Sequence, residues 1–206
     1  MKRVAIFVSG TGTNMENLIR KIQGGKVPGV EPALVISDNP GAGALEKAKR
    51  LGVEVSVLDR KRFESKEAFE RAVLKKLEES KIDFICLAGF MRILSPAFVE
   101  RYSGRLLNIH PALLPAFPGA HAIQDAFEAK VKETGVTVHF VDSGVDTGPV
   151  ILQRKVPVSP QDTLETLEAK VHAAEYEAYP EALRLVVTGQ IKLPQHHHDD
   201  EFWTKD

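Results

Sequence analysis

An amide and an imidazole stand two residues apart near the middle of the chain, in the run Asn108-Ile-His110-Pro111. Because side chains alternate between the two faces of a β-strand, Asn108 and His110 point to one side while Leu107 and Ile109 point to the other. Pro111 lacks a backbone donor and ends regular strand pairing, which places the pair at the carboxyl edge of a sheet. An amide donor beside a titratable ring predicts a site that polarises a carbonyl group and moves a proton.

A glycine-bearing loop at residues 142–149 carries the acid that we expect to complete this site. Its glycines permit unusual backbone geometry, and its aspartates can approach the edge of the sheet. We expect Asp146 to face His110, because a carboxylate within a few ångströms favours the protonated imidazolium. The structural alternative is that an aspartate near a glycine simply forms a turn. His139, in the middle of a predicted strand, is expected to serve packing or to support another site residue.

A glycine-rich loop, Ser9-Gly-Thr-Gly-Thr-Asn14, follows the first apolar run. Glycines let a backbone approach a ligand closely, and the amino end of the helix expected from Met15 attracts an anion, most often a phosphate. A dinucleotide fingerprint is excluded because its third glycine would fall on Met15, and a Walker lysine is absent. The three hydroxyl side chains of the loop and the Asn14 amide suggest a compact phosphate ester, with a structural turn as the alternative.

The elements that must position these residues follow a βαβ rhythm in the first half of the chain. Predicted strands cover residues 4–8, 33–36, 53–58, 84–88 and 106–109, and helical patterns such as 42–51 and 66–80 lie between them. Two later strands, 136–141 and 150–156, are joined by a loop too short for a helix, so at least one strand runs antiparallel. A long helix is expected from about residue 162. The pattern therefore predicts an α/β protein with a mostly parallel seven-stranded sheet and one antiparallel strand.

The composition narrows the class of protein. A length of 206 residues predicts one domain, and 27 Lys and Arg against 28 Asp and Glu leave a net charge of −1, which offers no field for a nucleic acid. The single cysteine, Cys86, excludes an internal disulfide and favours a reducing compartment. Only five apolar residues follow the basic start, too few for a signal peptide or a membrane span. We therefore expect a soluble, cytoplasmic protein without a membrane or nucleic-acid partner.

The carboxyl-terminal residues differ from the rest in composition. We expect a domain at residues 1–194 and a polar, flexible tail at residues 195–206. The tail contains His196, His197 and His198, but three successive residues do not preorganise a metal site. No functional metal is therefore expected.

Over residues 4–193 the chain resembles the folate-dependent glycinamide ribonucleotide formyltransferases of purine biosynthesis. Four motifs, which follow one another along the chain, carry this resemblance. Ser9-Gly-Thr-Gly-Thr-Asn14 resembles the phosphate loop of that family, and Leu87-Ala-Gly-Phe-Met-Arg-Ile-Leu-Ser-Pro96 resembles its pterin-side segment. Leu107-Asn-Ile-His-Pro-Ala-Leu-Leu-Pro115 resembles the formyltransferase signature, and Asp142 to Asp146 lie where the family has its catalytic acid. The resemblance implies a single-domain, three-layer α/β/α, Rossmann-like fold.

The same resemblance implies a reaction and its residues. The formyl group of 10-formyltetrahydrofolate would pass to the amine of glycinamide ribonucleotide, in a monomer or homodimer that needs no metal. The implied catalytic residues are Asn108, His110 and Asp146. The implied contacts of the ribonucleotide are Gly12, Thr13, Asn14 and Glu175, the first three at its phosphate. The implied contacts of the folate are Lys66, Met91, Arg92, Ile93, Leu94, Asn108, Asp142, Ser143, Gly144, Val145 and Asp146.

Two positions depart from the family pattern. Lys66 stands where relatives have an arginine, which keeps the charge but loses the planar fork that binds a carboxylate through two bonds. Ala112 stands where the signature commonly has serine, so a side-chain hydrogen bond is lost there. The family often has a cis peptide before the last proline of the signature, which predicts one at Leu114–Pro115.

Three other functions use part of the same features. A 10-formyltetrahydrofolate hydrolase would share the Asn, His and Asp groups, but usually carries a further amino-terminal domain, whereas this chain begins at its first predicted strand. Methionyl-tRNA formyltransferase shares the signature and normally adds an RNA-binding domain. A non-catalytic nucleotide-binding module would use the glycine-rich loop, with Asp38 as a ribose ligand. That module would leave the 108–115 and 142–148 segments unexplained.

Overall fold

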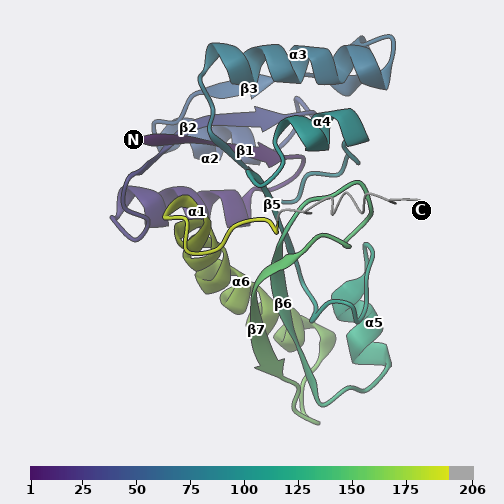
Figure 1. Cartoon of the computed structure of the whole chain (residues 1–206). Coiled ribbons are helices and arrows are strands. Elements are labelled where there is room, and N and C mark those ends of the chain that lie inside the picture. The colour runs from purple at the N-terminus through teal and green to yellow at the C-terminus, as the bar shows by residue number, and fades with distance from the viewer. Residues whose placement is uncertain (195–206) are drawn as a thin grey trace, which may run out of the picture.

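A seven-stranded sheet runs through the computed structural model, which describes residues 1–194 (Figure 1). The predicted tail at 195–206 and its three histidines lie outside the described residues. The strands are β1 (Lys2–Val8), β2 (Val30–Ser37), β3 (Val55–Val57), β4 (Phe84–Leu87), β5 (Leu106–His110), β6 (Glu133–Phe140) and β7 (Val150–Pro157). Their order in the sheet is β3-β2-β1-β4-β5-β6-β7. All seven predicted strands are therefore confirmed.

Strand direction also agrees with the sequence. β6 pairs antiparallel with both β5 and β7, whereas β1 to β5 pair in parallel. The prediction of one antiparallel strand is confirmed, because the short connections around β6 leave no room for a crossover helix. The chain builds outward from β1 to β3 and then returns to β4 on the other side of β1. This reversal makes a crevice at the carboxyl ends of β1 and β4, where open α/β sheets bind ligands.

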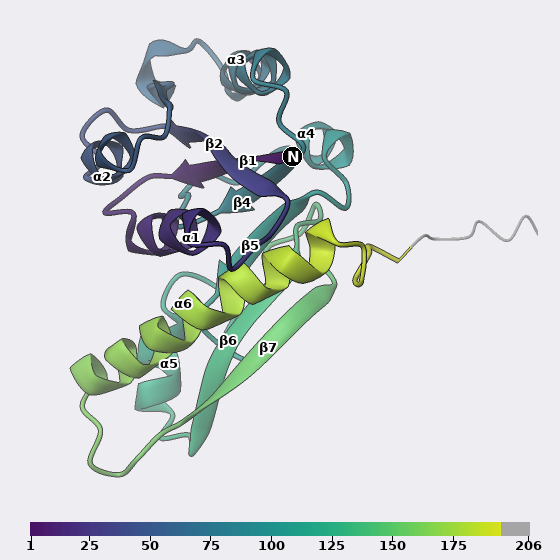
Figure 2. The same ribbon diagram turned by 90° about the vertical axis from the view of Figure 1, so that its left-hand side faces the viewer.

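Helices cover both faces of the sheet, which confirms the three-layer arrangement (Figure 2). They are α1 (Thr13–Gln23), α2 (Ala44–Arg50), α3 (Lys66–Glu79), α4 (Pro96–Arg101), α5 (Ala122–Glu128) and α6 (Leu164–Val187), with a 3-10 turn, η1 (Arg60–Arg62). Buried side chains of α1, α2 and α6 form one core with the sheet, and those of α3 and α4 form the other. Helices α4 and α5 were not predicted from the sequence, because helices of 6 and 7 residues have little periodic pattern.

The long helix α6 is the largest support of the site. It begins after Thr163, close to the expected start, and the Thr163 side chain caps it by accepting a hydrogen bond from the Thr166 backbone. Its buried stripe includes Leu167, Val171, Ala178, Leu183 and Val186, and each large apolar side chain in such a place contributes about 1.5–3 kcal/mol. The buried Tyr179 hydroxyl lies 2.7 Å from the Leu87 carbonyl and 3.1 Å from that of Leu107, so it bonds α6 to the ends of β4 and β5.

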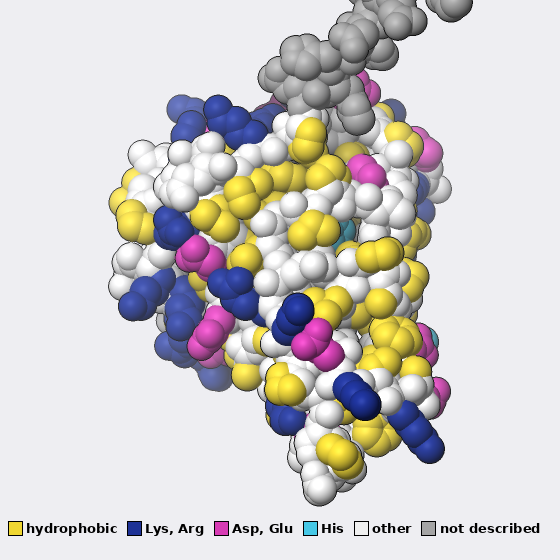
Figure 3. Space-filling view, turned by 60° about the horizontal axis from the view of Figure 1, so that its bottom comes forward, with side chains coloured by type: hydrophobic (Ala, Val, Ile, Leu, Met, Phe, Trp, Pro, Cys, Tyr) yellow, Lys and Arg dark blue, Asp and Glu magenta, His cyan; other side chains and the backbone are white. Residues whose placement is uncertain are grey.

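The alternation expected along β5 is present. Leu107 and Ile109 are buried in the core on the α6 side, and the strand ends at His110, immediately before Pro111. On β4, burial raises the pKa of the Cys86 thiol to about 12, which leaves it an inert core residue. No described helix is long and apolar enough to span a membrane. On the face in Figure 3, basic and acidic side chains are interspersed among apolar ones.

Candidate active site

The tip of β5 brings together three of the predicted site residues. His110 Nδ1 lies 3.5 Å from Asp146 Oδ2, although 35 residues separate them, and both side chains are largely buried, at 5% and 11% exposure. Asn108 stands on the same strand, with its side-chain nitrogen 3.5 Å from His139 Nε2. The glycine-bearing loop thus reaches the carboxyl end of β5, as expected from the sequence.

A second loop holds His110 from its other side. His110 Nε2 lies 2.8 Å from the Phe117 carbonyl, which can only accept a hydrogen bond, so Nε2 carries a hydrogen. Nδ1 faces the Asp146 carboxylate, a second acceptor. The ring thus lies between a backbone carbonyl and a carboxylate, so a hydrogen on either ring nitrogen would point at an acceptor. The backbone of Phe117 has φ +50°, a conformation that costs a bulky side chain about 1–3 kcal/mol and that concentrates at functional sites.

Asp146 is fixed by backbone rather than by neighbouring side chains. Its Oδ2 accepts a hydrogen bond of 3.0 Å from the Gly119 backbone N–H, and its own φ is +54°. The base of its loop closes at Gly148, where a Cβ would lie 1.7 Å from the Phe140 carbonyl oxygen. Only glycine allows that approach. One loop, at residues 117–119, therefore supplies both the carbonyl that orients His110 and the amide that orients Asp146.

His139 supports these residues as a neutral ring. Its Nδ1 lies 2.8 Å from the Phe140 carbonyl, so the hydrogen sits on Nδ1 and Nε2 is an acceptor. Nε2 faces Asn108 and lies 4.0 Å from Asp146 Oδ1. Burial lowers the pKa of His139, against the opposing effects of the Phe140 hydrogen bond and the Asp146 charge. Of the two expectations for His139, support of another site residue fits this position.

The glycine-rich loop lies at the neighbouring crevice of β1 and is joined to α6. α1 begins at Thr13, two residues before the predicted start, with Gly12 as its cap at φ +74°. A Cβ on Gly12 would lie 2.5 Å from the Ala44 Cβ, so α2 leaves no room for a side chain. Asn14 Nδ2 donates to Glu175 Oε2 at 2.5 Å, and Glu175 is 5% exposed. The structure therefore brings together the four residues expected to bind the ribonucleotide.

His172, which was not among the residues predicted from the sequence, completes this second cluster. Its Nδ1 donates to Glu175 Oε1 at 2.9 Å, and this bond raises the pKa of His172 more than partial burial lowers it. The side-chain oxygen of Asn14, Oδ1, is buried and has no hydrogen-bond partner among the described residues. A buried acceptor of this kind is costly unless a donor meets it, and a ligand hydroxyl would serve.

Ser9 differs from its predicted use. Its hydroxyl donates to Asp38 Oδ1 at 2.7 Å and accepts from the Met91 backbone N–H at 2.9 Å. The other oxygen of Asp38 accepts from Arg92 Nε at 2.8 Å. The Ser9 hydroxyl is thus committed within the protein and is not free for a phosphate. Asp38 is committed as well, which weighs against its alternative use as a ribose ligand.

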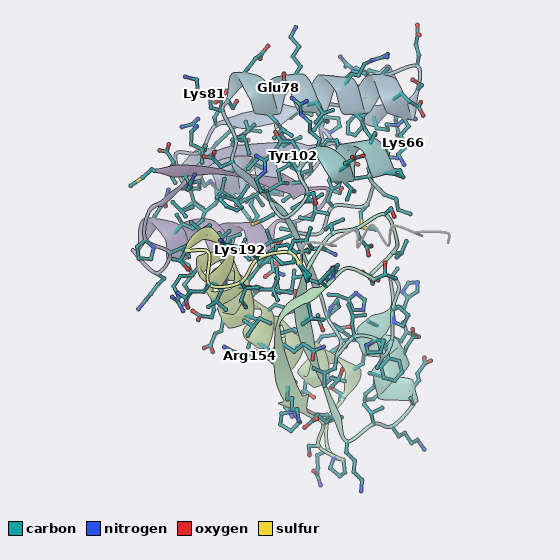
Figure 4. All side chains as sticks on the ribbon, viewed as in Figure 1. Lys66, Glu78, Lys81, Tyr102, Arg154 and Lys192 are labelled. Atoms are coloured by element: carbon teal, nitrogen blue, oxygen red, sulfur yellow. The ribbon has the colours of Figure 1, made fainter. Side chains whose placement is uncertain are left out.

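Some of the residues expected on the folate side line a cavity of about 320 Å³ between α3 and the segment after β4, namely Lys66, Met91, Arg92, Ile93 and Leu94. Asn108 and the residues of the 142–146 loop are not among its lining residues. Lys66 stands at its rim, at the end of α3 that lies near the carboxyl ends of the strands (Figure 4). Met91 and Ile93 are 76% and 65% exposed, and Val145 on the loop is 56% exposed. Large apolar side chains left open beside a cavity mark a binding surface for an apolar group.

Residues 2–183 match the formyl transferase family. The chain belongs to the formyl transferase family. It is 39% identical to the phosphoribosylglycinamide formyltransferase of Bacillus subtilis, over 89% of this chain and 94% of that protein. The crystal structure of phosphoribosylglycinamide formyltransferase from Bacillus halodurans is 49% identical, with a TM-score of 0.87 over 92% of this chain and 97% of that one.

Longer relatives contain the same region. This formyl transferase is 48% identical to the trifunctional purine biosynthetic protein adenosine-3 of Gallus gallus over 93% of its own length, but spans only 19% of that protein. It spans 14% of the corresponding protein of Drosophila melanogaster. The region shared with these relatives is thus a small part of their chains.

The structure shows how the signature segment is held, including its departure from the family pattern at Ala112. The peptide Leu114–Pro115 is cis, as the resemblance predicted. Ala112 is fully buried, and its carbonyl accepts a hydrogen bond of 2.7 Å from the Thr137 hydroxyl. The same hydroxyl accepts from the Leu114 backbone at 3.1 Å. The signature loop is therefore held by β6, without a side-chain hydrogen bond from position 112.

Proposed function

We propose that this formyl transferase moves the formyl group of 10-formyltetrahydrofolate to the amine of glycinamide ribonucleotide, in purine (IMP) biosynthesis. The observation that carries the proposal is the approach of Asp146 to His110, beside Asn108. The glycine-rich loop that precedes α1 lies at the end of the nearby strand β1. A histidine paired with an aspartate could serve as a general acid in many reactions. Its position between a phosphate-type loop and a cavity with both apolar and charged lining side chains favours transfer between an anionic acceptor and an aromatic donor that carries carboxylates.

The acceptor would bind across α1 and α6. The backbone N–H groups of the first turn of α1 have no partner within the helix, and the helix dipole favours an anion there, so they suit the phosphate. Glu175 and the open Oδ1 of Asn14 are acceptors, and would bind the ribose hydroxyls. This arrangement assigns the phosphate to backbone groups of Gly12 to Asn14 and the sugar to side chains.

The folate would bind between α3 and the loop at residues 142–146. The exposed side chains of Met91, Ile93 and Val145 would cover its rings, and Lys66 at the cavity rim would face its carboxylates. Polar contacts to the ring would come from backbone groups of the loop, since Asp142 Oδ1 already accepts from Gly144 N and the Thr147 hydroxyl.

The reaction forms one C–N bond and breaks another. The acceptor amine attacks the formyl carbon, and the carbonyl electron pair moves onto oxygen, giving a tetrahedral oxyanion. The Asn108 amide and the His110 imidazolium would stabilise that charge, with Asp146 holding the ring protonated and oriented. The bond to the folate nitrogen then breaks, and the pair left on that nitrogen takes a proton. The proton lost by the amine would reach it through His110 or through water.

The cellular setting is a separate proposal. The single cysteine is buried and unpaired, which suits a reducing compartment, and we infer a cytoplasmic enzyme, monomeric or homodimeric, that acts on small molecules. No group of three metal-ligating side chains occurs within residues 1–194. The chemistry described above uses no metal.

One assay separates the candidate activities. The protein is mixed with 10-formyltetrahydrofolate, and tetrahydrofolate release is measured with and without glycinamide ribonucleotide. Release that depends on the acceptor, with a formylated ribonucleotide as product, supports the transferase. Equal release without the acceptor would identify a hydrolase and contradict the proposal. Absence of release under both conditions would leave only a binding protein.

A further inference from the structure

Three strand ends meet at a buried carboxylate that neither proposed substrate site contains. Asp38 follows β2, Ser9 follows β1, and Arg92 belongs to the segment after β4. These strands are neighbours in the sheet, so their carboxyl ends converge. The Asp38 side chain is 4% exposed, and both of its oxygens accept hydrogen bonds. We call Ser9, Asp38, Arg92 and the Met91 backbone the Asp38 network.

The Ser9 hydroxyl joins the glycine-rich loop to the segment after β4. It accepts from the Met91 backbone N–H at 2.9 Å and donates to Asp38 Oδ1 at 2.7 Å. The Ser9 backbone is also held, because its N–H donates to the Gly89 carbonyl at 3.2 Å and its carbonyl accepts from Asn39 Nδ2 at 3.2 Å. The first residue of the proposed phosphate loop is thus fixed from both sides.

The second oxygen of Asp38 orients Arg92. The bond of 2.8 Å uses Nε, and the Arg92 side chain as a whole remains 43% exposed. Arg92 lines the two neighbouring cavities beside residues 91–94, and Nε makes its only hydrogen bond among the described residues. A carboxylate that receives both a hydroxyl and a guanidinium makes strong, charge-assisted bonds with defined geometry.

We propose that Asp38 is a positioning residue that sets the spacing between the acceptor and donor sites. It acts through Ser9 on the phosphate loop and through Arg92 on the segment that would cover the folate. This inference rests on the proposed function for the identity of the two substrates. Its physical basis is that transfer requires both reactants in one geometry, and a misplacement of about 1 Å at either site is costly.

Two substitutions test the two arms of the network. Asp38→Asn keeps the shape but places an amide where Arg92 Nε needs an acceptor, so we expect the KM for 10-formyltetrahydrofolate to rise about tenfold. Ser9→Ala removes the link to Met91 and should raise the KM for both substrates. Because the two residues share one network, the double variant should raise the KM by less than the product of the single effects. The kcat of each variant should fall as well, by up to about 10²-fold, because the two substrates are then no longer held in the reacting geometry.

Asp162→Asn is the matched control. Asp162 also pairs with a cation at short distance, 2.6 Å to Lys170, and is 6% exposed, but it lies at the start of α6 away from both sites. A merely structural role for Asp38 would make the two asparagine variants alike, each with a lower Tm and unchanged KM values. That outcome would overturn the inference. If Asp38→Asn does not fold, Ser9→Ala alone decides, because it removes one hydroxyl and no charge.

Direct binding separates failure of this inference from failure of the proposed function. The Kd values of tetrahydrofolate and of glycinamide ribonucleotide are measured by calorimetry for the wild type and both variants. If the wild type binds both but transfers no formyl group, the proposed reaction is wrong, while weaker binding to the variants still supports the network. If binding to the variants equals that of the wild type, the network does not position the sites. If the wild type binds neither compound, both proposals are wrong.

Discussion

The two ends of the candidate site use histidine in opposite ways. At the β5 end, His139 is buried, and burial lowers its pKa so that the neutral ring serves as an acceptor. At the α1 end, His172 is 48% exposed on its side chain, and its bond to Glu175 raises its pKa. The same side chain is therefore a fixed neutral group in one place and, in the other, a ring that a neighbouring carboxylate makes easier to protonate.

The two ends also differ in the groups that hold their functional side chains in place. The β5 end is held by backbone groups, namely the Phe117 carbonyl and the Gly119 amide, and by two residues at positive φ. The α1 end is held by side chains that contact each other across 161 positions of the sequence. The first arrangement gives a rigid, desolvated place for developing charge, whereas the second gives a polar surface for binding. We expect substitutions at the first end to change kcat and those at the second to change KM.

The largest effect is expected at the β5 end. His110→Ala and Asp146→Asn should each lower kcat by about 10²–10⁴, with a small change in KM, because both act on the oxyanion and its proton. Steady-state kinetics with both substrates measures this. Asp125→Asn, at an exposed aspartate of α5, is the matched control and should leave the rate unchanged. Near-full turnover by a folded His110→Ala variant would show that His110 takes no part in the chemistry. It would also contradict the expectation that the β5 end determines kcat.

A smaller effect is expected at the α1 end. Asn14→Ala removes the bond to the buried Glu175 and the open acceptor beside it, so the KM for glycinamide ribonucleotide should rise about tenfold with kcat nearly constant. Asn17→Ala is a close control, because Asn17 also bonds α1 to α6, at 2.7 Å to the Tyr176 carbonyl, but one turn further along α1. An equal rise in KM for both variants would mean that helix packing, not the ligand, is affected.

The two ends also differ in how well the sequence predicted them. The alternation of Asn108 and His110 along β5 is a local property, and the fold class followed from periodicity over whole segments. The approach of Asp146 depended on a loop path that no local pattern sets. Phe117 and Gly119 were missed because they contribute backbone groups, which carry no signal in residue type. His172 had a weak signal, since it precedes Glu175 by three positions on one helix face.

The buried histidine gives a prediction on stability. Because the pKa of His139 is lowered by folding, the unfolded chain binds a proton that the folded chain does not. Its contribution to stability is present above the ordinary value of about 6.5 and is lost as the pH falls through the lowered folded pKa. In thermal unfolding over this range, His139→Gln should therefore show a weaker loss of Tm in acid than the wild type. Parallel Tm curves would mean that folding leaves the pKa of His139 unchanged, and would contradict this prediction.

The exposed histidine should show the opposite slope and the smallest effect. Because the pKa of His172 is raised by Glu175, its contribution to stability is complete below about 6.5 and is lost as the pH rises through the folded pKa. The Tm of the wild type should thus exceed that of His172→Gln in mild acid by about 1–2 °C, with the difference fading toward alkaline pH, since exposed ion pairs contribute only about 0.2–1 kcal/mol. High salt should shrink the difference, because this pair is partly exposed and therefore screened. A difference that grew with pH would mean that Glu175 does not hold the proton on His172, and both histidines would then behave alike.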